Sequence, residues 1–186
     1  MREHAVTGAL TVSFQRYPYP PAGWVEALPR SRGALPLAAA APGRLLLGCP
    51  AGEAFWVGLV AGPGGPPSLV AAAAGLASGE RLDLASGAAP GPERRRGGLA
   101  VPPRFAVEGI ARPEGGWWAL AREAPAPAPA CAALELLVWT GPPAPAGPPA
   151  VVRFELVDPD RFRAAGGPPV PEPATDEEIY RGWRLP

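Results

Sequence analysis

Apolar and polar residues alternate along several segments of the chain, which is typical of β-strands that have one buried face. Residues 5–14 place valine, leucine and phenylalanine on one face and threonine or serine on the other. Residues 152–156 alternate valine, phenylalanine and leucine with arginine and glutamate. Both segments therefore predict half-buried antiparallel strands.

Short apolar runs between proline- and glycine-rich clusters predict further strands. These runs cover residues 44–49, 54–61, 69–77, 81–85 and 131–139. We expect the third and fourth runs to form a hairpin through Ser78 and Gly79. The last run is almost entirely apolar, so we expect it to be covered on both faces. The other segments have different predictions: no regular structure at 25–44, a loop with three arginines at 88–98, and a stiff extended spacer at 124–130.

Residues 105–122 predict a β-hairpin that carries two adjacent tryptophans. The turn is supplied by the sequence PEGG at 113–116, since proline presets φ for an early turn position and glycine accepts positive φ. Trp117 and Trp118 then begin the return strand. Because side chains alternate across a strand, the two rings must point to opposite faces of the sheet.

One short helix is predicted near residues 159–165. Asp158 suits the N-cap, Pro159 suits the first helical position, and Gly166 suits a left-handed stop. These signals complete an all-β fold: an antiparallel β-sandwich or jelly-roll-like domain of about eight to ten strands over residues 1–167. Residues 168–186 then form a proline-rich spacer and a C-terminal tail.

The tail combines a helix signal with several apolar residues. Thr175 and Glu178 have the spacing of a capping box, which predicts about one helical turn over residues 176–181. Ile179, Tyr180, Trp183 and Leu185 follow within seven residues. A helix this short is marginal in water, so we expect the tail to dock on its own body or on a partner.

Charge and composition narrow the possible partners and the location. The chain has 17 arginines, no lysine, no asparagine and a net charge of zero, so it lacks the basic surface of a nucleic-acid binder. Because the missing residues have AT-rich codons, the composition indicates a GC-rich genome. We find no secretory signal and no apolar run long enough to span a membrane. We therefore expect a cytoplasmic or assembly-associated protein.

Two cysteines, Cys49 and Cys131, lie far apart and outside any metal-binding spacing. The favoured interpretation is a pair of buried thiols in strands. A single disulfide between strands and a reactive thiol are the alternatives.

Residues that could carry catalysis are few. The only histidine is His4, and no nucleophile, Walker or zinc motif is present. Asp158 and Asp160 are explained by helix capping, so we expect neither metal nor cofactor. A hydrolase that uses two carboxylates is an alternative that we consider unlikely. Its candidates near aromatic or strand residues are Glu53, Glu108, Glu114 and Glu135.

The six tryptophans are the other residues of the chain that could form a binding site. Large aromatic rings anchor protein interfaces and also stack on sugars. We therefore expect a non-catalytic structural or protein-interaction module of a larger bacterial or phage assembly, with a protein partner or self-association. The alternative is a carbohydrate- or small-ligand-binding module. The candidate contact residues are Trp117, Trp118, Trp56, Tyr180, Trp183 and Leu185.

Overall fold

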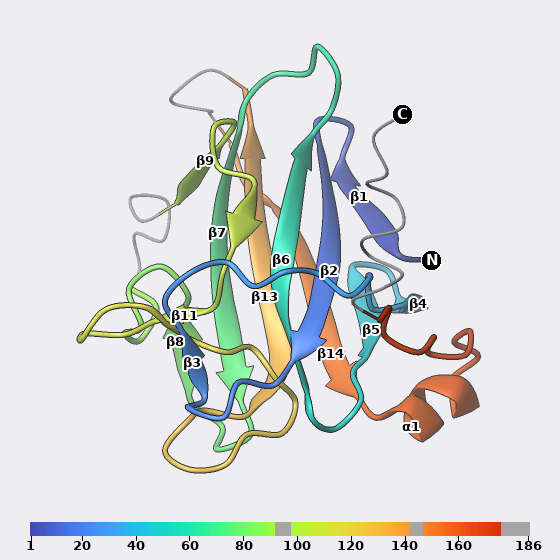
Figure 1. Cartoon of the computed structure of the whole chain (residues 1–186). Coiled ribbons are helices and arrows are strands. Elements are labelled where there is room, and N and C mark those ends of the chain that lie inside the picture. The colour runs from blue at the N-terminus through green and yellow to red at the C-terminus, as the bar shows by residue number, and fades with distance from the viewer. Residues whose placement is uncertain (92–97, 142–146, 176–186) are drawn as a thin grey trace, which may run out of the picture.

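Two β-sheets pack face to face and enclose the main core, with a third small sheet and one helix at the sides (Figure 1). The structure is a computed structural model that describes residues 1–91, 98–141 and 147–175. The predicted all-β sandwich with one short helix is confirmed. The described residues form fourteen strands rather than eight to ten, because the sequence pattern does not reveal several strands of only two or three residues.

The four-stranded sheet has the order β1, β2, β6, β10. Its strands are β1 (Glu3–Thr7), β2 (Leu10–Pro18), β6 (Glu53–Ala61) and β10 (Ala106–Val107). The single strand predicted at 5–14 is wrong, since the chain turns at Gly8 and Ala9 and splits it into a β1–β2 hairpin. The predicted inward face of β2 is confirmed: Leu10, Val12 and Phe14 are buried.

The seven-stranded sheet has the order β4, β5, β14, β13, β7, β8, with β9 also paired to β7. Its strands are β4 (Leu37–Ala41), β5 (Arg44–Gly48), β14 (Ala150–Val157), β13 (Cys131–Thr140), β7 (Ser68–Leu76), β8 (Arg81–Asp83) and β9 (Leu99–Val101). Strands β5 and β14 are parallel, and the other pairs are antiparallel.

Three expectations for this region need correction. Strand β4 lies where no regular structure was predicted, because its alanines carry no strand-like alternation. Strand β13 is not covered on both faces: alternate residues are buried, while Ala132 is exposed. Residues 124–130 are not an extended spacer, since the Ala128 N–H donates to the Pro125 carbonyl in a turn and Ala128 is buried.

Three phenylalanines join the two large sheets. The Phe14 ring of β2 lies 5.6 Å from the Phe55 ring of β6 and 4.6 Å from the Phe154 ring of β14, measured between centroids. Both contacts have the edge-to-face geometry that aromatic pairs prefer. Leucine, valine and alanine side chains from both sheets complete this core.

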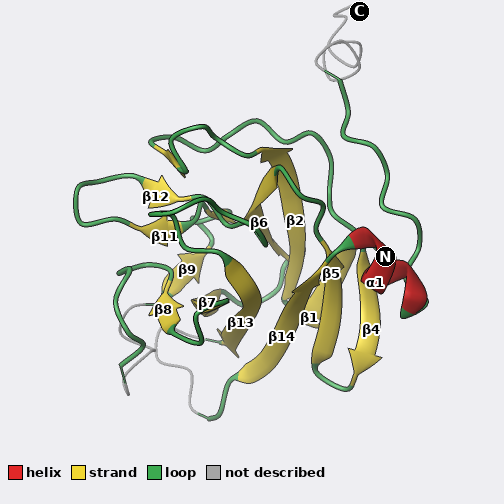
Figure 2. Ribbon diagram, turned by 90° about the horizontal axis from the view of Figure 1, so that it is seen from below, coloured by secondary structure: helices red, strands yellow, loops and turns green. Residues whose placement is uncertain are grey.

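The helix α1 (Pro159–Ala164) follows β14 and confirms the capping prediction. The Asp158 carboxylate accepts the N–H groups of Asp160 and Arg161, and Gly166 has a φ of 84° just after the helix. Phe162 is buried against Leu46 and Val157, so the helix covers one end of the seven-stranded sheet. Figure 2 shows the helix and the β11–β12 hairpin on opposite sides of the sandwich.

Candidate interaction surface

The predicted tryptophan hairpin forms part of the third sheet. This sheet has the order β11 (Ile110–Ala111), β12 (Trp117–Trp118), β3 (Trp24–Val25). In the register, Trp118 lies opposite Trp24 and Trp117 lies opposite Val25. The strand assignment of the tryptophan pair is therefore confirmed. Trp118 packs against the main core, whereas Trp117 is half-buried and lies outside the described core clusters.

An arginine covers one face of two tryptophan rings. The guanidinium carbon of Arg112 lies 4.2 Å from the Trp24 ring centroid and 4.7 Å from the Trp118 ring centroid. A cation over an aromatic face is attracted by the ring quadrupole. These contacts occupy surfaces that a sugar ring would need for stacking, and they give the two rings a structural role.

The hairpin turn offers a matched pair of glycines for a stability test. Gly115 and Gly116 both have positive φ, of 96° and 71°. They differ in the space around them: a Cβ added at Gly115 would meet nothing within 4 Å, whereas a Cβ added at Gly116 would lie 2.6 Å from the Val25 carbonyl oxygen. Gly115→Ala should therefore lower the free energy of unfolding by about 1–2 kcal/mol, the cost of a left-handed alanine. Gly116→Ala should cost at least about 1 kcal/mol more because of crowding. Urea unfolding compares them, and equal losses would contradict the close β12–β3 contact.

Trp56 lies on β6 and is held by a neighbouring loop. Its Nε1 donates to the Pro29 carbonyl oxygen at 3.0 Å, and its half-buried ring packs beside Tyr17 and Ala54. The polar atom of the indole is therefore already used within the protein. The other candidate contact residues, Tyr180, Trp183 and Leu185, lie outside the described residues.

The spacer that leads to the tail is described as far as Thr175, and it lies against the body. Val170 packs on the cluster around Phe162. The carbonyl oxygen of Pro171 accepts from Nη1 of Arg16. The Ala174 N–H donates to the Arg32 carbonyl oxygen at 3.0 Å. These contacts hold the spacer against the body of the protein up to residue 174, so they determine the position of Thr175.

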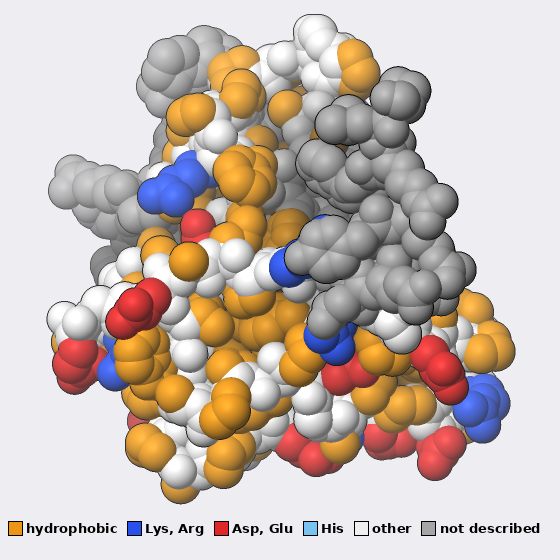
Figure 3. Space-filling model, viewed as in Figure 1, with side chains coloured by type: hydrophobic (Ala, Val, Ile, Leu, Met, Phe, Trp, Pro, Cys, Tyr) orange, Lys and Arg blue, Asp and Glu red, His pale blue; other side chains and the backbone are white. Residues whose placement is uncertain are grey.

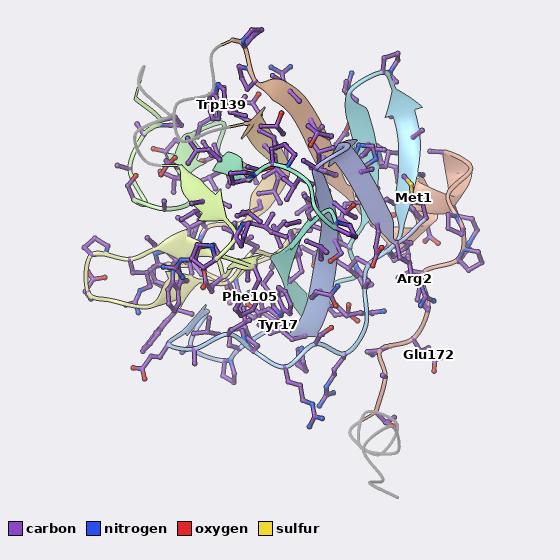
Figure 4. All side chains as sticks on the ribbon, turned by 90° about the horizontal axis from the view of Figure 1, so that it is seen from above. Met1, Arg2, Tyr17, Phe105, Trp139 and Glu172 are labelled. Atoms are coloured by element: carbon purple, nitrogen blue, oxygen red, sulfur yellow. The ribbon has the colours of Figure 1, made fainter. Side chains whose placement is uncertain are left out.

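Beside this spacer lies a hollow of about 460 Å³ that we call the arginine groove. It is defined by the side chains of Arg2, Arg16 and Arg32 together with Gly33, Ala34 and residues 171–175. Figure 4 shows Arg2 and Glu172 on the same side of the molecule. In Figure 3, the arginine side chains that can be seen on the front face are scattered among hydrophobic and acidic ones.

The arginine groove continues into two smaller hollows, and Arg32 lines all three. One, of about 240 Å³, is lined by Tyr17, Pro18 and Glu53 among others. The other, of about 360 Å³, is lined by residues that include Tyr17, Pro29 and Arg30. The three hollows therefore adjoin one another, and arginine, tyrosine and proline are among the residues that line them.

A buried ion pair lies beside the arginine groove, because Arg16 lines the groove and its partner Glu53 lines one of the adjoining hollows. The Arg16 side chain is 2% exposed and binds Glu53 through both Nε and Nη2, with Nε 2.6 Å from Oε2. Strand pairing explains the contact, since Arg16 and Glu53 lie on the adjacent strands β2 and β6. This fork-like geometry matches two guanidinium N–H groups to two carboxylate oxygens. It holds Arg16 rigidly at the point where it also binds the spacer.

The sequence predictions missed this surface, although one signal was present. Arg16 is the next residue in the alternating series Leu10, Val12 and Phe14, whose side chains all point into the core. A charged residue at an inward position requires a partner, but nothing local identifies Glu53, 37 positions away.

Each carboxylate of the hydrolase alternative is paired with an arginine. Glu53 binds Arg16, and Glu135 binds both Arg81 at 2.6 Å and Arg153 at 2.8 Å. The other two form looser pairs, Glu108 with Arg104 at 3.4 Å and Glu114 with Arg112 at 3.6 Å. The four carboxylates thus have separate cationic partners.

Both cysteines are buried free thiols. Burial raises the pKa of Cys49 to about 11 and that of Cys131 to about 12. Cys131 lies in β13, while Cys49 follows the end of β5 and its carbonyl oxygen accepts from Nε of Arg122 at 3.0 Å. The favoured interpretation of two buried thiols is confirmed, with Cys49 just outside a strand.

Two further observations concern only the described part of the chain. No helix there has both the length and the apolar character needed to cross a membrane. No group of three or more histidine, cysteine, aspartate or glutamate side chains there could hold a metal ion.

Comparisons with protein-family models, with curated proteins and with solved structures found no significant match to this chain.

Proposed function

We propose that this chain is a non-catalytic protein-interaction module that contacts its partner through the C-terminal tail and the surface beside the arginine groove. The observation that carries the proposal is the position of Thr175, the last described residue, in the lining of this groove. The aromatic residues of the tail therefore follow within ten positions of a surface made of arginine, tyrosine and proline. Tyrosine, tryptophan and arginine are the residue types most enriched at the energetic centres of interfaces.

The shape of this surface also supports the proposal. Three adjoining hollows share Arg32 in their linings, so the surface offers several recessed contacts to a partner. The ion pair between Arg16 and Glu53 fixes part of the wall of one of these hollows. A rigid wall lowers the entropic cost of binding, because few side chains must be ordered when a partner arrives.

The mass of the protein in solution tests the proposal, with self-association as the measured contact. We expect the full chain to form a dimer or larger assembly at tens of micromolar, measured by light scattering after gel filtration. A variant with Tyr180→Ala, Trp183→Ala and Leu185→Ala should be a monomer with an unchanged unfolding midpoint, since removing apolar anchors weakens association.

Two results would contradict this expectation. If the variant and the full chain have the same assembled mass and the same stability, the tail does not make the contact. If both are monomers and the variant is less stable, the apolar residues only close their own fold.

A further inference from the structure

A hollow of about 320 Å³, which we call the sheet hollow, shares no lining residue with the arginine groove. It lies on the outer face of the seven-stranded sheet, because Leu134 points into the core and the adjacent Ala133 and Glu135 therefore point outward. Its floor contains Ala133 of β13 and Gly75 of β7, which are neighbours in the strand register. The sheet is recessed here because one residue has no side chain and the other has only a methyl group. A Cβ added at Gly75 would lie 3.7 Å from the Ala133 Cβ, an ordinary contact, so the fold would tolerate a larger residue.

Two arginines stand on opposite sides of the sheet hollow and are held by one glutamate. Arg81 comes from β8 and Arg153 from β14, which lie on either side of the β13–β7 pair. Glu135 of β13 binds both: its Oε1 accepts from Nη2 of Arg81 at 2.6 Å, and its Oε2 accepts from Nε of Arg153 at 2.8 Å. The Glu135 side chain is only 12% exposed. Both guanidinium groups are therefore positioned before any ligand arrives, which lowers the entropic cost of binding.

Most of the N–H groups of these two arginines remain accessible. The Arg81 side chain is 50% exposed and that of Arg153 is 63% exposed. A guanidinium has five N–H groups, and within the described part of the chain each arginine gives one nitrogen to Glu135 and none to another acceptor. Asp83, the other carboxylate on this side of β8, accepts two backbone N–H groups of its own turn. Two cations thus share one anion at the sheet hollow, which leaves a local excess of positive charge.

From this arrangement we propose that the sheet hollow binds a carboxylate of an acidic segment in a protein partner. A carboxylate matches two N–H groups of one guanidinium in a single plane, and Arg153 uses only its Nε for Glu135. A nucleic acid suits this surface less well, because its binding relies on a patch of many cations and the chain has a net charge of zero. The inference goes beyond the proposed function, since it assigns a partner of stated charge to a surface that includes neither the arginine groove nor the tail.

A peptide of six glutamates with a fluorescent label is the probe, and fluorescence polarisation measures its binding to the full chain. In low salt, about 0.05 M sodium chloride, we expect saturable binding with a dissociation constant below about 1 mM, as charge-assisted hydrogen bonds at one site provide. Raising the salt to about 0.5 M should weaken binding at least about tenfold, because salt screens exposed charges. A peptide of six glutamines should not bind.

Three variants show whether the peptide occupies the sheet hollow. Gly75→Val fills the floor with a residue that strands favour, so it should keep the urea unfolding midpoint and weaken binding at least about fivefold. Arg153→Lys keeps the positive charge but loses the planar fork, and it should weaken binding to a similar extent. The matched control Arg104→Gln removes an arginine that is 57% exposed and paired with Glu108 elsewhere on the surface, and it should leave the affinity unchanged.

The absence of saturable binding in low salt would overturn the inference, and so would equal affinities of the unaltered chain, Gly75→Val and Arg153→Lys. Tighter binding of a single-stranded DNA of equal charge would also overturn it, because the site would then select phosphate. The variant of the tail with Tyr180→Ala, Trp183→Ala and Leu185→Ala should bind the peptide as the unaltered chain does. Peptide binding without self-association would support the sheet hollow and contradict the proposed function, and the reverse result would do the opposite.

Discussion

Replacing Arg16 with methionine is expected to lower the free energy of unfolding by about 3–5 kcal/mol, the cost of removing one partner of a buried ion pair. The Arg16 side chain is 2% exposed and that of Glu53 is 14% exposed. The substitution would leave the Glu53 carboxylate enclosed without its cation. It would also remove the donor to the Pro171 carbonyl oxygen. Urea unfolding at pH 7, followed by tryptophan fluorescence, measures the loss.

A double variant separates the charge from the packing. Arg16→Met with Glu53→Met should recover most of the lost stability, because an apolar pair of similar volume avoids the desolvation of both charges. Arg44→Met is the matched control at an exposed pair with Glu155, and it should cost less than about 1 kcal/mol. A double variant as unstable as Arg16→Met would show that shape, not charge, governs this position.

Stability is also expected to fall steeply as the pH rises from 9 to 12. The pKa of Cys49 and that of Cys131 rise from about 9 to about 11 and about 12 on folding, mainly through burial. Folding therefore favours the protonated thiols. Their contribution to stability is complete below pH 9 and is lost as the pH passes through the folded values. Linkage gives a combined loss of roughly 3–5 kcal/mol by pH 11.

The composition makes this alkaline transition easy to assign. Lysine is absent, so its titration does not overlap with that of the thiols. Burial, and secondly the neighbouring Tyr19, also raises the pKa of Tyr17, which adds to the loss above about pH 10. Urea unfolding between pH 8 and 11 should show a shallower decline in the variant Cys49→Ala, Cys131→Ala than in the unaltered chain. Parallel declines in the two proteins would exclude the thiols as the cause.

The sequence predicted those strands, caps and turns that are determined by residues close together in the chain. The alternation of Val152, Phe154 and Leu156 gave the buried face of β14, and all three are buried. Asp158 and Pro159 gave the start of α1, because capping acts within one turn. The turns at Gly79 and at residues 113–116 were predicted for the same reason.

Features that depend on distant pairing could not be predicted. The hydrophobic pattern does not determine that Trp24 pairs with Trp118, 94 positions away, or that Arg112 lies over both rings. The arginine groove joins Arg16 to Pro171 across 155 positions. Alternation predicts which face of a strand is buried but not which strand lies beside it, so the candidate surface required the three-dimensional structure.

The parallel pairing of β5 with β14 has a consequence for how the chain is made. Residues 44–48 pair with residues 153–157, so synthesis must add more than a hundred residues before β5 meets its neighbour. During this interval the β4–β5 hairpin has an open edge, which can bind other nascent chains. Closing so long a loop costs entropy before any contact is gained. We therefore expect folding to be slow and to be completed only after β14 leaves the ribosome.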